Sequence, residues 1–211
     1  MFRRILASVS NKQGLVDFLK PFVEQGATVV SSGGTAELLS KAEIKVTEVS
    51  QYTGFPECLG GRVKTLHPKV HMGLLYRADN EQDVDTLNQY EVQPFDLVIV
   101  NLYPYAEART QGLDDKELVE FIDIGGPAML RASAKNYENV CVVCDPADYR
   151  WVAEKNGELS LDDRRYLAAK VFQMTSQYDQ MIAKDLYTSL ESLNEQSKPL
   201  MLHGSLVASL R

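Results

Sequence analysis

The chain has 211 residues and a formal net charge of −7 at neutral pH. This length fits one large domain or two small ones, and 45% hydrophobic with 24% charged residues is typical of a globular protein. The acidic balance argues against a protein wrapped in nucleic acid, although it leaves room for a local basic pocket that binds a small phosphorylated ligand.

Membrane and secretion signals are missing from the sequence. The apolar runs are far shorter than the ~20 residues of a membrane span, and the short apolar run after Arg4 is no signal peptide. We therefore expect a reducing cytoplasm. Cys141 and Cys144 have the spacing of a metal or redox pair, but they lie on opposite faces of a predicted buried strand. We expect them to pack in the core rather than bind zinc.

Two strand–loop–helix units open the chain. Residues 4–9 predict an apolar strand, and apolar residues at helical spacing from Leu15 predict a helix that Ser10 would cap. Residues 27–30 predict a second strand, followed by a Gly-rich and hydroxyl-rich loop and a helix over 36–41. Both loops would lie at the carboxyl edge of a parallel sheet, beside helix N-termini that favour anions.

Each of these loops also has an interpretation without a ligand, because helix caps and tight turns use the same residue types. Two such loops in succession favour phosphate binding. The residues expected to bind it are Ser8, Ser10, Lys12, Ser32, Gly33, Gly34 and Thr35.

A basic stretch over 60–68 follows a short strand at 45–49 and a loop over 51–59. Two glycines free its backbone, and Arg62 and Lys64 would point the same way from a short extended piece. Two cations on one face suit an anionic ligand, whereas a solvated basic loop is the alternative.

The clearest buried strand is predicted over 95–100. It ends in Asn101 and Tyr103, which would share a face and either contact a ligand or anchor the loop. Helices are predicted from 67 toward 76, over 83–90 and over 115–122.

A glycine turn precedes the next helix, with Gly126 as the expected N-cap and Pro127 as the first helical residue. The N–H groups of Gly125 and Gly126 could point at a developing oxyanion. The remaining elements are a strand over 140–144, a short helix over 148–154 and one long or two shorter helices over 161–190. We predict one α/β domain over 1–190, with a mainly parallel sheet, and a C-terminal tail over 191–211.

Seven motifs together resemble a known family: 8–12, 32–35, 54–57, 60–68, 101–104, 123–126 and 131–136. They are similar, in type and order, to those of the IMP cyclohydrolase domain of the bifunctional purine-biosynthesis enzyme, over about residues 2 to 190. The resemblance implies a three-layer fold like that of methylglyoxal synthase. Residues 199–205 depart from the family's link to its formyltransferase domain, so no transformylase activity is assigned.

The resemblance implies the last step of de novo purine biosynthesis, which closes 5-formamidoimidazole-4-carboxamide ribotide (FAICAR) to inosine monophosphate (IMP) with loss of water. The carboxamide nitrogen attacks the formyl carbon of the same molecule, so positioning, a base, oxyanion donors and an acid are needed. The implied catalytic residues are Lys64, Tyr103, Asp123 and Lys135. The implied further substrate contacts are Arg62, Thr65, Asn101, Ile124 and Gly125. No metal or other cofactor is expected.

We expect Asp123, with Lys135 and Tyr103, to handle the amide proton. Lys64 and the N–H groups near Ile124 would then stabilise the formyl oxygen. Twelve positions separate Asp123 from Lys135, or about 18 Å along an unbroken helix. A direct pair therefore requires the chain to fold back or a neighbouring subunit to supply one residue.

Three other functions compete with this interpretation. Methylglyoxal synthase shares the fold and the phosphate loops, and a non-catalytic nucleotide-binding regulatory domain would not need the four catalytic residues together. The third alternative is that the chain is an inactive remnant of the bifunctional enzyme. The expected partners are a purine ribonucleotide, a homodimer mate and a separate transformylase, with neither nucleic acid nor membrane.

Overall fold

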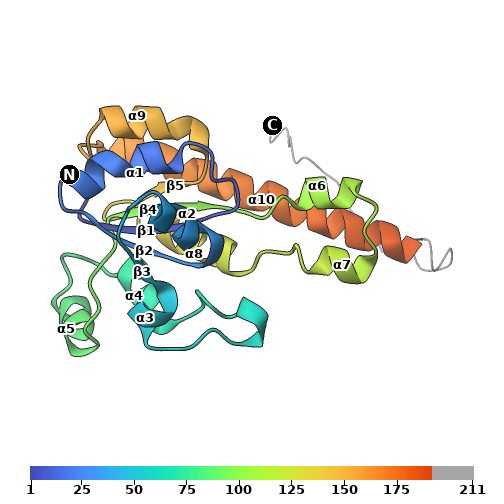
Figure 1. Ribbon diagram of the computed structural model, residues 1–211, viewed down its shortest axis with the longest axis horizontal. Coiled ribbons are helices and arrows are strands. Elements are labelled where there is room, and N and C mark those ends of the chain that lie inside the picture. Colours follow the sequence, from blue (N-terminus) through green and yellow to red (C-terminus); the bar gives the residue numbers. More distant parts are fainter. Residues whose placement is uncertain (192–211) are drawn as a thin grey trace, which may run out of the picture.

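The computed structural model describes residues 1–191, with side chains through 188, so the predicted tail lies almost wholly outside the described residues. A central sheet of five parallel strands has the order β3-β2-β1-β4-β5 (Figure 1). The strands are β1 (Arg4–Val9), β2 (Thr28–Ser31), β3 (Val46–Glu48), β4 (Leu97–Asn101) and β5 (Cys141–Val143). The predicted α/β fold with a mainly parallel sheet is confirmed.

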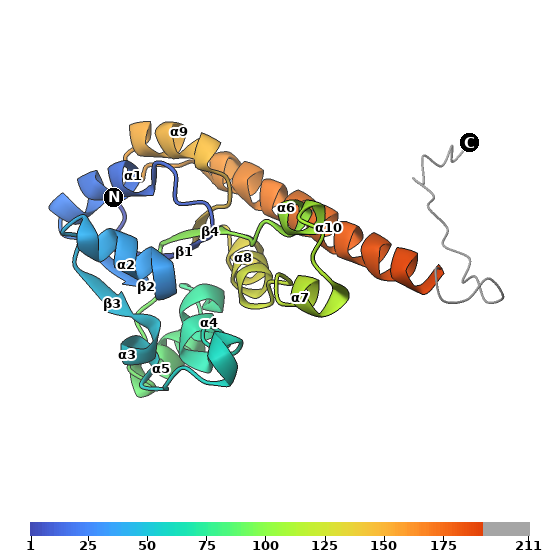
Figure 2. The same cartoon turned by 45° about the vertical axis from the view of Figure 1, so that its right-hand side comes forward.

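Helices cover both faces of this sheet and make it a three-layer structure (Figures 1 and 2). They are α1 (Leu15–Glu24), α2 (Gly33–Lys41), α3 (Val49–Thr53), α4 (Pro68–Leu75), α5 (Glu81–Gln89), α6 (Tyr105–Thr110), α7 (Asp115–Val119), α8 (Gly125–Lys135), α9 (Tyr149–Glu154) and α10 (Leu161–Glu191). Helices α1, α2 and α9 pack on one face, and α4, α8 and α10 pack on the other. None of the helices in the described part is long and apolar enough to span a membrane.

The strands divide the core into two clusters because their side chains alternate between faces. Ile5 lies in the cluster beside α1, and Leu6 lies in the cluster beside α8. Cys141 and Cys144 are buried in opposite clusters, which confirms that both pack in the core. Burial raises the pKa of the Cys141 thiol to about 12 and that of the Cys144 thiol to about 11.

Two helix N-caps differ from the sequence prediction, and α2 begins at Gly33 rather than at residue 36. Helix α1 begins after Gly14, which adopts a left-handed conformation, so Ser10 is not its cap. Helix α8 begins at Gly125 with Ile124 as the N-cap, and Pro127 is its third residue. Proline is tolerated there because the first-turn N–H groups have no intrahelical partner.

Two short helices were not predicted, α3 across the end of the expected strand over 45–49 and the start of the loop over 51–59, and α6 after the fourth strand. Five or six residues give too few apolar repeats for a periodic signal. The last helix is a single rod of 31 residues, which decides between the two predicted alternatives.

Residues 102–122 leave the sheet after β4 and return just before α8, carrying α6 and α7 (Figure 1). Both short helices lie alongside the far half of α10, beyond the end of the sheet (Figures 1 and 2). Tyr105, Ala108, Leu118 and Tyr178 form a small buried cluster at this contact. The long helix α10 therefore supports a segment that leaves the carboxyl end of β4 and leads back to the start of α8.

Candidate functional site

A pocket of about 630 Å³ lies at the carboxyl ends of β1, β2 and β4. Ligands of open α/β sheets bind at this edge, and this volume is typical of a small-molecule site. All predicted site residues except Lys135 line it. They are Ser8, Ser10, Lys12, Ser32, Gly33, Gly34, Thr35, Arg62, Lys64, Thr65, Asn101, Tyr103, Asp123, Ile124 and Gly125.

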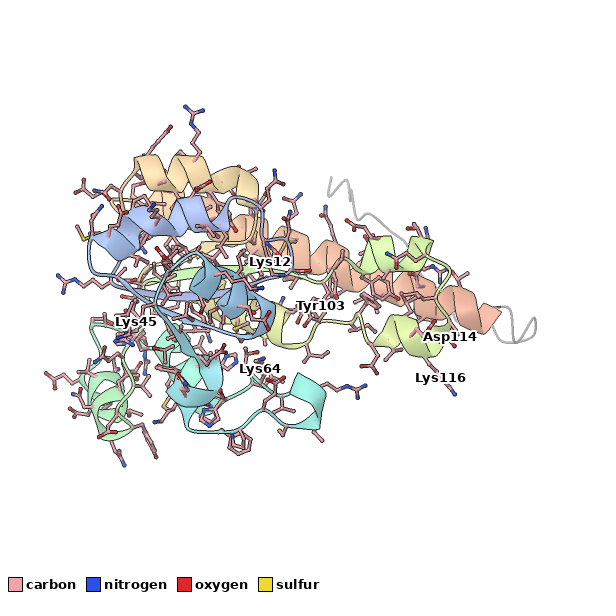
Figure 3. All side chains as sticks on the ribbon, in the orientation of Figure 1. Lys12, Lys45, Lys64, Tyr103, Asp114 and Lys116 are labelled. Carbon is pink, nitrogen blue, oxygen red and sulfur yellow. The ribbon has the colours of Figure 1, made fainter. Side chains whose placement is uncertain are left out.

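One end of the pocket is the N-terminus of α2. Ser32 caps this helix in an extended conformation, and the free N–H groups of its first turn begin at Gly33. A Cβ at Gly33 would lie 3.4 Å from the Lys64 ammonium, and one at Gly34 would lie 3.5 Å from Cε of Lys12. The two glycines thus let two lysine side chains approach a helix N-terminus from the β1 loop and from the basic stretch (Figure 3). This arrangement suits a phosphate group.

The side chains of two predicted ligand contacts, Thr35 and Asn101, form hydrogen bonds within the protein. The buried Thr35 hydroxyl donates to the carbonyl of Val9 and accepts from its N–H, both at 3.0 Å. Its single proton is therefore in use, and only the Thr35 backbone N–H is left to bind an anion. A phosphate contact by Thr35 therefore stays a prediction for its backbone N–H, while its hydroxyl holds the end of β1.

Asn101 also holds a loop. Its Oδ1 accepts the N–H groups of Ser10 and Asn11 at 2.7 and 2.8 Å, and its Nδ2 donates to the Asn11 carbonyl at 2.9 Å. One Nδ2 proton remains for a ligand. These bonds also explain why Ser10 is not a helix cap, because they fix the backbone of residues 10 and 11 as a loop.

The opposite end of the pocket is the turn before α8. Asp123 Oδ1 accepts the N–H of Gly126 at 2.8 Å, and the backbone N–H of Tyr103 also donates to this carboxylate. Burial nevertheless raises the pKa of Asp123 above the usual value of an aspartate, and the two N–H donors only partly oppose this. Asp123 is therefore a carboxylate with increased basicity, and half-exposed Tyr103 lies beside it in the pocket.

Two glycines allow this turn to pack closely. A Cβ at Gly126 would lie 2.4 Å from Asp123 Oδ2, and one at Gly125 would lie 2.3 Å from the Thr65 hydroxyl. Thr65 is buried, so the basic stretch is fixed against the start of α8. The pocket therefore has two helix N-termini, that of α2 near the lysines and that of α8 near Asp123.

The basic stretch is not extended, which corrects the prediction. A 3-10 turn at Leu59–Gly61 is followed by further turns, and Arg62 and Lys64 have different surroundings. Arg62 pairs with Glu120, and its side chain is 66% exposed. Lys64 is 19% exposed and its Nζ lies 2.9 Å from Oε2 of Glu57. Because this stretch forms turns rather than a strand, the two cations do not point the same way: Arg62 is largely exposed and Lys64 is mostly covered.

The two carboxylates of these pairs also line the pocket, and the sequence reasoning did not assign them a role. Glu57 ends the motif over 54–57, three positions before the basic stretch begins, and this place in a family-like motif was the available sequence signal. Glu120 gave none, because it lies on the segment over 102–122 that only the tertiary structure brings back.

Lys135 lies outside the pocket. It is an exposed residue at the last turn of α8, whereas Asp123 precedes the first turn. The helix between them is unbroken and places them about 15 Å apart along its axis. The chain does not fold back there, so Lys135 and Asp123 form no pair within one described chain.

No group of three or more His, Cys, Asp or Glu side chains among the described residues is arranged to hold a metal ion. The polar groups of the pocket are hydroxyls, amides, two lysines, the Arg62 guanidinium and single carboxylates. Such a set can bind an anionic ligand and exchange protons with it.

The chain was compared with known proteins. The MGS-like domain family matches residues 14–128, and the AICARFT/IMPCHase bienzyme family matches residues 133–211. The bifunctional purine biosynthesis protein PurH of Aquifex aeolicus is 48% identical over 202 residues, which cover 93% of this chain and 40% of that protein. PurH of Nostoc punctiforme is 47% identical over 217 residues, covering 100% and 42%.

A crystal structure of ForH is similar with a TM-score of 0.74 and 34% sequence identity, covering 87% of this chain and 98% of that chain. The chain spans about two-fifths of the length of the PurH relatives, so their names describe longer proteins.

Proposed function

The chain belongs to the MGS-like domain family, with PurH proteins among its relatives, and on this premise we propose that it is an IMP cyclohydrolase. The proposed reaction closes FAICAR to IMP and releases water. One observation carries the proposal: a basic helix N-terminus and a partly buried carboxyl with a raised pKa face the same pocket. The first suits the phosphate of a mononucleotide, and the second suits proton transfer at its base.

The phosphate would bind at the N-terminus of α2. Its free N–H groups and the Lys12 ammonium supply donors there, while Ser10 and Ser32 add hydroxyl groups nearby. This leaves the other end of the pocket for the imidazole carboxamide, beside Tyr103 and Asp123. A ligand bound at both ends would hold the two reacting groups together, which supplies much of the rate in an intramolecular closure.

Asp123 is the proposed base that takes the proton of the attacking carboxamide nitrogen. The formyl oxygen gains negative charge, which Lys64 and the N–H groups at the start of α8 would stabilise. That oxygen needs two protons: Tyr103 or Lys64 would donate the one that makes it a hydroxyl, and protonated Asp123 would return the other as the hydroxyl leaves as water. The former formamide nitrogen gives up its own proton as the ring C=N bond forms, which balances the loss of water. No cofactor enters these steps.

Lys135 would take part only from a second copy of the chain, because its own chain holds it at the far end of α8. This role requires a homodimer. A mixture of the Asp123→Asn and Lys135→Ala proteins should then regain part of the activity that each lacks alone, measured as IMP formation. Normal turnover by Lys135→Ala alone would remove Lys135 from the mechanism, and a mixture without recovery would contradict a site shared between copies.

The cyclohydrolase proposal is tested by incubating the purified chain with FAICAR and following IMP absorbance. We expect turnover well above the spontaneous rate. No excess product would contradict the proposal and favour a regulatory nucleotide-binding domain, and phosphate release from dihydroxyacetone phosphate would favour methylglyoxal synthase. With the cyclohydrolase function we also propose a cytoplasmic location and a separate transformylase as the source of FAICAR.

Glu57 should weaken nucleotide binding, because its carboxylate neutralises Lys64 at the pocket. Glu57→Gln is expected to lower the Kd of IMP about 2- to 5-fold, the range of a half-exposed ion pair. Isothermal titration at low and high salt would measure this, and the gain should shrink at high salt. Glu120→Gln is the matched control, because its partner Arg62 is largely exposed and the gain should be smaller. Weaker binding by Glu57→Gln would show that Glu57 holds Lys64 in place rather than competing for it.

A further inference from the structure

The turn that carries Asp123 is attached to α10, a helix that has no residue in the pocket. Residues 102–122 begin at the end of β4 and end at this turn, and their helices α6 and α7 pack on the far half of α10 (Figure 2). Tyr103 and Asp123 therefore lie at the two ends of a segment that α10 supports. The contact that fixes residues 121 and 123 on α10 therefore bears directly on where the Asp123 turn lies.

Tyr178 of α10 makes the direct contact. Its hydroxyl accepts the N–H of Asp123 at 2.8 Å and donates to the carbonyl of Phe121 at 3.0 Å. The side chain is only 6% exposed, and its ring packs edge-on against Tyr105 with the ring centroids 6.3 Å apart. Burial raises the pKa of Tyr178, so the hydroxyl remains a donor at neutral pH.

These bonds fix the backbone on both sides of residue 122. The Asp123 carboxylate is held separately, by the N–H groups of Gly126 and Tyr103. The side-chain bonds set the direction of the carboxylate, whereas the Tyr178 bond sets the position of the backbone that bears it. Proton transfer depends on both, because a misplacement of about 1 Å can cost about 100-fold in rate.

We propose that Tyr178 is a positioning residue, which holds the Asp123 turn at the geometry needed for proton transfer through its paired hydrogen bonds to residues 121 and 123. This inference rests on the proposed cyclohydrolase function. It assigns part of the site to a residue that lies 55 positions after Asp123 and outside the pocket. Phosphate binding at the N-terminus of α2 does not depend on this contact.

Tyr178→Phe tests the proposal, because it keeps the ring in the cluster and removes only the hydroxyl. We expect kcat to fall about 10-fold or more, with KM and the Kd of IMP within about twofold of the wild type. Tyr105→Phe is the matched control: Tyr105 is 2% exposed in the same cluster and its hydroxyl faces Asp185 rather than Asp123. The kcat of Tyr105→Phe should equal that of the wild type, even if its Tm falls by as much as the Tm of Tyr178→Phe.

Amide hydrogen exchange at Asp123 gives a second measurement that needs no turnover. Exchange should be faster in Tyr178→Phe and unchanged in Tyr105→Phe, because only the first loses the acceptor of this N–H. Equal kcat in the two variants would overturn the proposal, as would unchanged exchange at Asp123. Absence of turnover in the wild type would instead contradict the cyclohydrolase function, and the exchange rates would still decide whether Tyr178 fixes the turn.

Discussion

Asp123→Asn should lower kcat for ring closure by about 10²- to 10⁴-fold, the range that one acid–base group contributes. An amide of the same shape can still accept the N–H of Gly126, but it cannot take a proton from the carboxamide nitrogen. KM should change little, because the expected phosphate contacts lie at the other end of the pocket. Steady-state formation of IMP measures both constants. A variant with near-wild-type kcat would remove Asp123 from the mechanism.

The pKa of Asp123 adds a pH dependence. Because burial raises this pKa above 3.8, the acid limb of the wild-type kcat/KM profile should lie above the usual range of an aspartate. Activity should fall as the pH drops through the raised value and the base becomes protonated. A profile that stays flat down to the ordinary aspartate range would contradict Asp123 as the base.

The same shift predicts an effect on stability. Folding raises the pKa of Asp123, so ionisation disfavours the folded state at neutral pH, and this penalty disappears once the carboxyl is protonated in both states. The Tm of Asp123→Asn relative to the wild type should therefore rise between about pH 4 and pH 7. Thermal unfolding of both proteins across this range would test the sign, and a Tm difference that moves in favour of the wild type as the pH rises would contradict it.

Lys64→Met should lower kcat by about 10²- to 10³-fold, the cost of removing one donor to a developing oxyanion. The methionine keeps the unbranched apolar stem of the side chain and removes the charged terminal group. Lys64 is the less exposed cation of the basic stretch, and its ammonium lies between Glu57 and the N-terminus of α2. From there it can face either the phosphate or the reacting formyl group, and a kinetic measurement separates the two roles.

Lys12→Met is the control for this test. Lys12 approaches the same helix at Gly34, but it comes from the β1 loop and is exposed. We expect Lys12→Met to raise KM with little change in kcat, which is the result for a lost ground-state contact. If Lys64→Met gave the same pattern, Lys64 would belong to the phosphate site and the formyl oxygen would depend on the α8 N–H groups alone.

The phosphate loops could be predicted from the sequence because they are local. Apolar strands, a Gly-rich turn and a following amphipathic helix occupy neighbouring positions, and their periodicity predicts the parallel fold. A parallel sheet then brings the carboxyl ends of its strands to one edge, so Ser10, Gly33 and Asn101 share a pocket although up to 91 positions separate them.

The state of each side chain could not be predicted in this way. The Thr35 hydroxyl is used by Val9, and the Asn101 amide is mostly used by the β1 loop. Hydrogen-bond saturation depends on contacts between distant segments, which leave no periodic signal in the chain. For the same reason the pairing of Lys64 with Glu57 appeared only once the turns of the basic stretch were placed.

The sequence by itself therefore determined the fold class, the edge of the sheet that holds the site and most of the residues that line it. Only the tertiary structure decided which of them remain free to act. It placed Lys135 at the far end of an unbroken helix and brought Tyr178 of α10 against the Asp123 turn. Local patterns specify elements because propensity and periodicity act over a few residues, whereas packing alone sets which atoms of distant elements meet.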